Sequence, residues 1–157
     1  MQPTHFKPDL WVGNINDGTN FEWLRRFGIR NIANLTGIEC GQTVAGFNTL
    51  LLSQEDGEPI LPETLRRFFD WMAQQIGPTF IHCHAGISRA SSFTLAWCMY
   101  QEGDSDNPSI SDPASKWLSV TRRWDRFETE LTRVRPWIRP HPRLKQSIIE
   151  YFISEGL

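Results

Sequence analysis

Hydrophobic residues in the first third of the chain predict short strands that alternate with a helix. Segments of strand length with several apolar residues occupy residues 10–13, 29–36 and 47–53. Between the first two runs, apolar residues recur at helical spacing over residues 21–27. The order strand, helix, strand is typical of a parallel sheet, and we expect one here.

The limits of these elements follow from their end residues. Thr19 and Glu22 have the spacing of a capping box, which predicts that the helix begins just after Thr19. Gly28 stands where a helix commonly ends in a left-handed residue. The three consecutive leucines at 50–52 are typical of a strand that is covered on both faces.

Helical patterns dominate the rest of the chain. Pro62 suits a first helical position, and apolar residues then recur at Leu65, Phe68, Phe69, Met72 and Ile76 before Gly77 ends the helix. A second stripe follows the capping residue Asp112 over residues 113–134, and a third covers 144–152. We expect the second stripe to pack on the core, with a contact to another chain as the alternative. The polar residues 103–113 predict a loop.

One segment combines a strand, a tight loop and a helix start. Residues 79–83 are apolar, residues 89–100 are apolar on nearly every face like a buried helix, and Gly86 lies between them. Amides at a helix N-terminus favour an anion, and their field also stabilises a nucleophilic thiolate such as that of Cys83. Arg89 could clamp two oxygens of a phosphate. A buried cysteine beside a structural arginine is the alternative, but it explains neither the glycine nor the setting.

The segment His-Cys-His-Ala-Gly-Ile-Ser-Arg resembles the His-Cys-x5-Arg signature of the cysteine-dependent protein tyrosine phosphatase superfamily, in the wording of its dual-specificity branch. Residues 10–14 and 135–140 resemble that branch too, although His141 stands where it usually has Asn. The resemblance implies one compact phosphatase domain over residues 1–157, with an extended helical insertion at about 113–134. The implied fold is α/β, a mostly parallel central sheet with helices on both faces.

The resemblance also implies roles for the loop residues. Cys83 would attack phosphorus, and Arg89 would hold the phosphate. The phosphate would also be bound by the loop residues His84, Ala85, Gly86, Ile87 and Ser88. His82 would orient or tune Cys83, or it would be an ordinary hydrogen-bonded structural histidine.

A general acid is also needed, because the leaving oxygen must be protonated. The family carries an Asp on a loop before the helix that here begins at Pro62, and Asp56 matches that place, followed by Gly57 as a hinge. Glu55 and Glu58 are the alternatives, and all three acids would be a solvated loop if the chain were no enzyme.

Ala90 departs from the family, which usually places Ser or Thr directly after the signature arginine. That hydroxyl stabilises the thiolate when it leaves in the second step. Ser91 would point about 100° away along a helix, and Ser88 is the better-placed substitute. Either breakdown of the thiophosphate is slow, or another group takes the role.

Composition limits the wider setting. The chain has 157 residues, 39% of them hydrophobic, and a net charge of −2, which gives no general field for nucleic acid or membranes. Three cysteines make no disulfide framework, and the N-terminus lacks the apolar region of a signal peptide. We therefore expect a cytoplasmic protein, a monomer rather than a dimer, with no cofactor or metal, no nucleic acid partner and no membrane partner.

The resemblance implies phosphorylated proteins or peptides as substrates. No long recognition loop for a deep phosphotyrosine slot is evident, which resembles the shallow pocket of the dual-specificity branch. A phosphoinositide phosphatase or an RNA 5′-phosphatase remains an alternative with the same Cys83 and Arg89. A phosphate-binding module with weak turnover is an alternative of another class, and Ala90 is the residue that motivates it.

Overall fold

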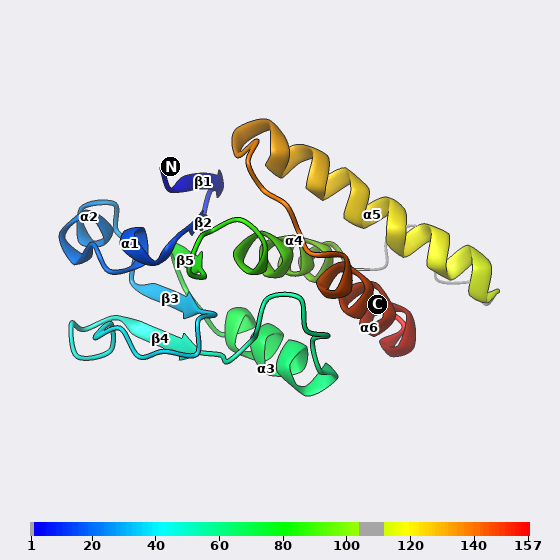
Figure 1. Ribbon diagram of the computed structural model, residues 1–157, viewed down its shortest axis with the longest axis horizontal. Coiled ribbons are helices and arrows are strands. Elements are labelled where there is room, and N and C mark those ends of the chain that lie inside the picture. The colour runs from blue at the N-terminus through cyan, green and yellow to red at the C-terminus, as the bar shows by residue number, and fades with distance from the viewer. Residues whose placement is uncertain (1, 104–111) are drawn as a thin grey trace.

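A five-stranded sheet forms the centre of the computed structural model, which describes residues 2–103 and 112–157 (Figure 1). The strand order is β1-β2-β5-β3-β4, with bounds Thr4–Lys7, Leu10–Gly13, Thr79–His82, Asn31–Asn34 and Asn48–Leu51 respectively. Only β1 pairs antiparallel, and the other neighbours are parallel, so the mostly parallel sheet is confirmed. Most of the segment predicted as a loop, 103–113, lies outside the described residues.

Helices cover both faces of the sheet, as expected (Figure 1). One face carries the short helices α1 (Ile15–Gly18) and α2 (Phe21–Arg26). The other face carries α3 (Pro62–Ala73), α4 (Arg89–Glu102), α5 (Pro113–Val134) and α6 (Pro142–Glu155). Neighbouring strand residues alternate between the two cores, since Phe80 packs with the α2 side and Ile81 with the α4 side.

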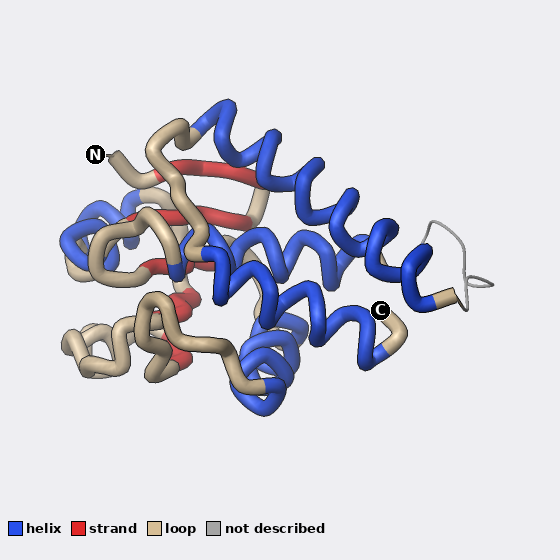
Figure 2. Tube along the Cα trace, turned by 45° about the vertical axis from the view of Figure 1, so that its right-hand side comes forward, coloured by secondary structure: helices blue, strands red, loops and turns tan. Residues whose placement is uncertain are grey.

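The central helix α4 is the most enclosed element. All residues from Ala90 to Met99 are buried, because α4 packs on β2 and β5 and is surrounded by α3, α5 and α6 (Figures 1 and 2). The prediction of a buried helix after residue 89 is confirmed. The prediction of one helix over residues 113–134 is also confirmed, and the Asp112 side chain caps it by accepting from Ser115 N.

The register of the parallel strands brings their carboxyl ends to one edge. Asn34 lies opposite both Leu51 and His82, and His82 lies opposite Gly13. The loops that follow these four strands therefore meet at the same edge, which is where parallel sheets of this kind form their sites.

Several predicted limits were wrong. Helix α2 begins after Asn20, whose side chain accepts from Trp23 N, while Thr19 ends helix α1, which was not predicted. Helix α3 ends at Ala73, so Ile76 is 90% exposed instead of completing the apolar stripe. Strand β4 lies at the edge of the sheet, and Leu51 is only half-buried.

Candidate active site

The loop from Cys83 to Ser88 joins β5 to α4 at the carboxyl edge of the sheet. Cys83 is buried, and its Sγ accepts hydrogen bonds from the backbone amides of Gly86 at 3.2 Å and Ala90 at 3.4 Å. His84 and Ala85 lie on the exposed side of the same loop. The sulfur atom is therefore held by one amide of the loop and one amide of the first turn of α4.

The carbonyl groups of this loop are held from outside. His84 O accepts from Ile15 N at 3.1 Å, Gly86 O from Arg135 Nε at 3.0 Å, and Ile87 O from Arg139 N at 2.9 Å. A trans peptide points its N–H away from its C=O. The N–H groups that follow these carbonyls, those of Ala85, Ile87 and Ser88, are thus turned to the opposite side, towards the interior of the loop. Inward amides of this kind form a cradle for an anion.

Arg135 is a buried support of the loop that no local pattern in the sequence indicates. Besides Gly86 O it donates from Nη1 to Gln2 O at 2.7 Å and Thr4 Oγ1 at 2.9 Å, and its burial lowers its pKa. Gly86 has φ +71°, and a Cβ there would lie 2.6 Å from Arg135 Nη2. Any larger residue at position 86 would clash with this guanidinium, so the position requires glycine.

Arg89 begins helix α4 and links the loop to two other strand ends. Its Nη1 donates to Gln54 O at 2.9 Å and is 3.5 Å from Leu35 O. Leu35 follows β3, and Gln54 precedes the acidic residues of the loop after β4. The guanidinium therefore lies where three of the loops at this edge meet.

Asp56 is the acidic residue that the fold brings to the Cys83 loop. Ser88 Oγ donates to Asp56 Oδ1 at 2.6 Å and accepts from His141 N at 3.0 Å. The side chains of Glu55 and Glu58 are exposed and make no described hydrogen bond to the loop. Among the three acids considered from the sequence, the geometry singles out Asp56.

Within residues 2–103 and 112–157, no hydroxyl group replaces the one that Ala90 lacks. Ser91 Oγ donates back to Ile87 O at 2.7 Å, and Ser88 Oγ is turned to Asp56, so the expectation that Ser88 serves Cys83 was wrong. Among the described residues, the donors to Cys83 Sγ are backbone amides alone. The sulfur lacks the side-chain donor that the family usually supplies.

His82 is fully buried directly before the cysteine. Its Nδ1 lies 3.2 Å from Cys83 O, and its Nε2 lies 2.8 Å from Gln42 Nε2. Burial, together with the charge of Arg89, lowers the pKa of His82 to about 4. The imidazole is therefore neutral at physiological pH.

We expect this neutral histidine to make the fold sensitive to acid. The folded-state pKa of about 4 lies below the ordinary 6.5. As the pH falls, this histidine therefore takes up a proton in the unfolded chain before it does so in the folded protein. The free energy of unfolding decreases as the pH falls from about 6.5 to about 4. Linkage gives a loss of about 2 kcal/mol between pH 7.5 and pH 5. Urea unfolding at both pH values should show that this difference shrinks in His82→Gln; an equal difference in both proteins would contradict the assignment.

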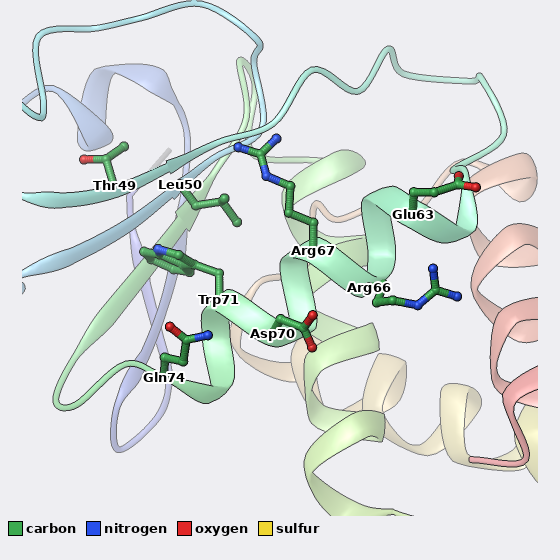
Figure 3. A pocket seen from close by; sticks show the side chains of 8 residues that line it. All are labelled: Thr49, Leu50, Glu63, Arg66, Arg67, Asp70, Trp71 and Gln74. Atoms are coloured by element: carbon green, nitrogen blue, oxygen red, sulfur yellow. The ribbon is translucent and has the colours of Figure 1, made fainter.

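Other features of the surface lie apart from this loop. A depression of about 590 Å³ between β4 and α3 is lined by side chains of both charges, Glu63, Arg66, Arg67 and Asp70 along α3, with Trp71 on the same helix (Figure 3). Mixed charges offer no special attraction for a phosphate group. Within the described residues, no three His, Cys, Asp or Glu side chains are placed to hold a metal ion, and no helix is both long and apolar enough to cross a membrane.

Known phosphatases are similar to this chain in sequence and in fold. No family model matches the chain. The chain is 30% identical over 101 residues to Protein-tyrosine-phosphatase MKP1 of Arabidopsis thaliana, covering 61% of this chain and 13% of that protein. It is 32% identical over 97 residues to Dual specificity protein phosphatase MPK-4 of Drosophila melanogaster, covering 57% and 25%. The matched segment is thus a quarter or less of either relative.

The fold matches solved phosphatase structures over almost its whole length. The Yvh1 phosphatase domain from Chaetomium thermophilum superposes with a TM-score of 0.77 at 16% identity, covering 98% of this chain and 97% of that one. At this identity the likeness shows the fold, while the sequence matches connect it to dual-specificity phosphatases. In sequence the chain is thus similar to dual-specificity phosphatases of the cysteine-dependent protein tyrosine phosphatase superfamily, and its fold is that of solved members of this branch.

Proposed function

We propose that this domain hydrolyses phosphomonoesters of proteins, phosphotyrosine and also phosphoserine or phosphothreonine, through a cysteinyl-phosphate intermediate. The observation that carries the proposal is the placement of Cys83 Sγ beneath the inward amides of its loop, with Asp56 bonded to Ser88 of that same loop. The nucleophile, an anion cradle and a proton donor thus meet at one edge of the sheet.

In the first step the Cys83 thiolate attacks phosphorus, and the bond from phosphorus to the substrate oxygen breaks. The loop amides from His84 to Arg89 and the Arg89 guanidinium hold the three other phosphate oxygens as charge develops on them. Asp56 protonates the leaving oxygen. Because Oδ1 accepts from Ser88, the other oxygen, Oδ2, is left to carry that proton.

In the second step water attacks the phosphorus of the thiophosphate. The Asp56 carboxylate takes a proton from this water, the bond from phosphorus to sulfur breaks, and the thiolate leaves with inorganic phosphate as the product. The amides of Gly86 and Ala90 stabilise the departing thiolate, since both already point at Sγ.

A substrate panel tests the proposed function. We expect steady hydrolysis of nitrophenyl phosphate and of phosphotyrosine and phosphothreonine peptides, and little hydrolysis of phosphoinositides or RNA 5′-triphosphates. If phosphate is released faster from a phosphoinositide or an RNA 5′-triphosphate than from the phosphopeptides, the physiological substrates are of that other class and not proteins. A reducing, cytoplasmic setting belongs to the same proposal, because its nucleophile is a free thiol. The proposal also takes the domain to act as a monomer.

A phosphate-binding module with weak turnover is a second candidate. Ala90 favours it, because the described structure supplies no hydroxyl to Cys83 Sγ. Such a module would bind a phosphate group in the same cradle, but it would hydrolyse its cysteinyl-phosphate only slowly.

We expect this missing hydroxyl to limit turnover at the second step. A hydrogen bond to a charged group contributes about 1.5–3 kcal/mol, so breakdown of the thiophosphate should be about ten- to a hundredfold slow. Rapid mixing with nitrophenyl phosphate should show a burst of nitrophenol followed by a slow steady rate. Ala90→Ser should raise the steady rate and shrink the burst.

Ala96→Ser is the matched control, because Ala96 is also fully buried in α4 but lies six residues beyond Ala90, whose amide bonds Cys83 Sγ. It should leave the burst unchanged. If the wild type shows no burst and Ala90→Ser gains nothing, the backbone amides alone are sufficient. A burst without any steady turnover would favour the binding module.

A further inference from the structure

A buried row of polar side chains lies behind Cys83 and ends on His82. Gln42 and His82 are both completely inaccessible to solvent. Gln42 Nε2 lies 2.8 Å from Gly18 O and 2.8 Å from His82 Nε2, and its Oε1 lies 3.3 Å from Asn34 Nδ2. These contacts join the end of α1, the loop after β3 and the end of β5.

The donor and acceptor in each hydrogen bond of this row follow from the orientation of the Asn34 amide. Asn34 Oδ1 accepts from both the backbone amide of Thr36, at 3.0 Å, and the Thr36 hydroxyl, at 2.7 Å. Asn34 Nδ2 must then be the donor to Ile38 O and to Gln42 Oε1. Gln42 Nε2 consequently donates one hydrogen to Gly18 O and the other to His82 Nε2.

Only one neutral tautomer of His82 can accept the hydrogen bond from Gln42 Nε2. Its Nε2 has to accept, and a neutral imidazole carries a single N–H, so the proton resides on Nδ1. That N–H donates to Cys83 O, 3.2 Å away. The ring has little freedom to turn, because a Cβ at Gly18 would lie only 2.6 Å from His82 Cδ2.

The orientation of Cys83 O decides where the next amide points. Since a trans peptide directs its N–H opposite to its C=O, a carbonyl held by His82 sends the N–H of His84 to the other side. His84 is the first residue after Cys83 in the proposed anion cradle. The row from Asn34 to His82 thereby aligns an amide that would bind the phosphate.

We propose that Gln42 is a positioning residue that holds His82 as its Nδ1–H tautomer and so turns the first amide of the cradle towards the phosphate. This role rests on the proposed function, but it acts on anion binding and can be measured without turnover. Among the described residues, Arg89 is the charged side chain that affects the pKa of His82. Cys83 is the next residue in the chain, and the neutral residues Gly18, Gln42 and Phe80 lie against the His82 ring.

The first experiment uses the unaltered protein. Long-range proton–nitrogen NMR spectra of the histidine rings distinguish a protonated from a bare ring nitrogen. We expect His82 to show a protonated Nδ1 and a bare Nε2 from pH 5.5 to pH 8, with and without inorganic phosphate. A protonated Nε2 over this range would overturn the proposal.

The second experiment compares two variants of Gln42 by titration with inorganic phosphate. Gln42→Met keeps the volume but has no donor, so phosphate affinity relative to wild type should fall about tenfold at every pH. In Gln42→Glu the new carboxylate accepts, which draws the His82 proton to Nε2 at high pH and leaves Nδ1 bare. Adding one proton to this pair restores the Nδ1–H donor. The affinity ratio to wild type should therefore recover as the pH falls from 8 to 5.5.

Asn31→Ala is the matched control. Asn31 is another buried amide on β3, but it donates to Pro78 O and Ile76 O at the opposite end of the strand. It should lose stability without changing the His82 tautomer or the phosphate affinity. Gln42 variants that bind phosphate as Asn31→Ala does would overturn the proposal, and if Gln42→Glu does not fold, Gln42→Met and the wild-type spectra still decide. Expected binding results without any hydrolysis would refute the proposed enzyme while leaving the role of Gln42 intact.

Discussion

Cys83→Ser is expected to lower the hydrolysis of nitrophenyl phosphate on the order of 10⁴-fold or more while keeping phosphate binding. A serine hydroxyl is not ionised at neutral pH, so it cannot attack as a thiolate does. The cradle does not depend on sulfur, because its carbonyl groups are held by Ile15, Arg135 and Arg139. Steady-state kinetics and calorimetric titration with inorganic phosphate measure the two properties separately.

The matched control is Cys98→Ala. Cys98 is buried in α4, and burial raises the pKa of its thiol to about 12, so it has no nucleophilic role. This variant should retain the wild-type rate. Substantial activity in purified Cys83→Ser would exclude the cysteinyl-phosphate intermediate.

Asp56→Asn is expected to slow substrates with poor leaving groups by about 10²–10⁴-fold, which is the usual contribution of general acid catalysis. Nitrophenyl phosphate should be affected much less, because nitrophenolate leaves without full protonation. The physical reason is that asparagine has the same shape and can still accept from Ser88, but it has no proton to give. The rates for a series of aryl phosphates of increasing leaving-group pKa measure this difference.

Glu55→Gln and Glu58→Gln serve as controls on the same loop. Both glutamates are exposed, and neither side chain is bonded to the Cys83 loop in the described structure. They should show no dependence on the leaving group. If Glu58→Gln shows that dependence and Asp56→Asn does not, the general acid is Glu58.

Local patterns were sufficient to predict most of the fold. The strands at 10–13 and 79–82, the buried helix after Arg89 and the long helix after Asp112 are each specified within a short stretch of chain. The errors occurred where two neighbouring residues could do the same task. Thr19 and Asn20 can both cap a helix, and the sequence does not show that a preceding helix already uses Thr19.

The candidate site was predictable only in part, for a related reason. The loop from Cys83 to Arg89 is one contiguous segment, whereas its supports come from far along the chain. Arg135 is 49 residues from Gly86, and Gln42 is 40 residues from His82. The direction of the Ser88 hydroxyl likewise depends on Asp56, whose position is set by the strand register and not by nearby sequence.

The buried guanidinium of Arg135 joins the anion cradle to the beginning of the chain. It donates to Gly86 O in the loop and, at the same time, to Gln2 O before β1 and to Thr4 Oγ1 at the start of β1. Attachment of this first strand and occupancy of the cradle are therefore linked equilibria, and linkage is reciprocal. Bound inorganic phosphate should slow hydrogen exchange at the β1 amides, and a loosened β1 should in turn weaken phosphate binding.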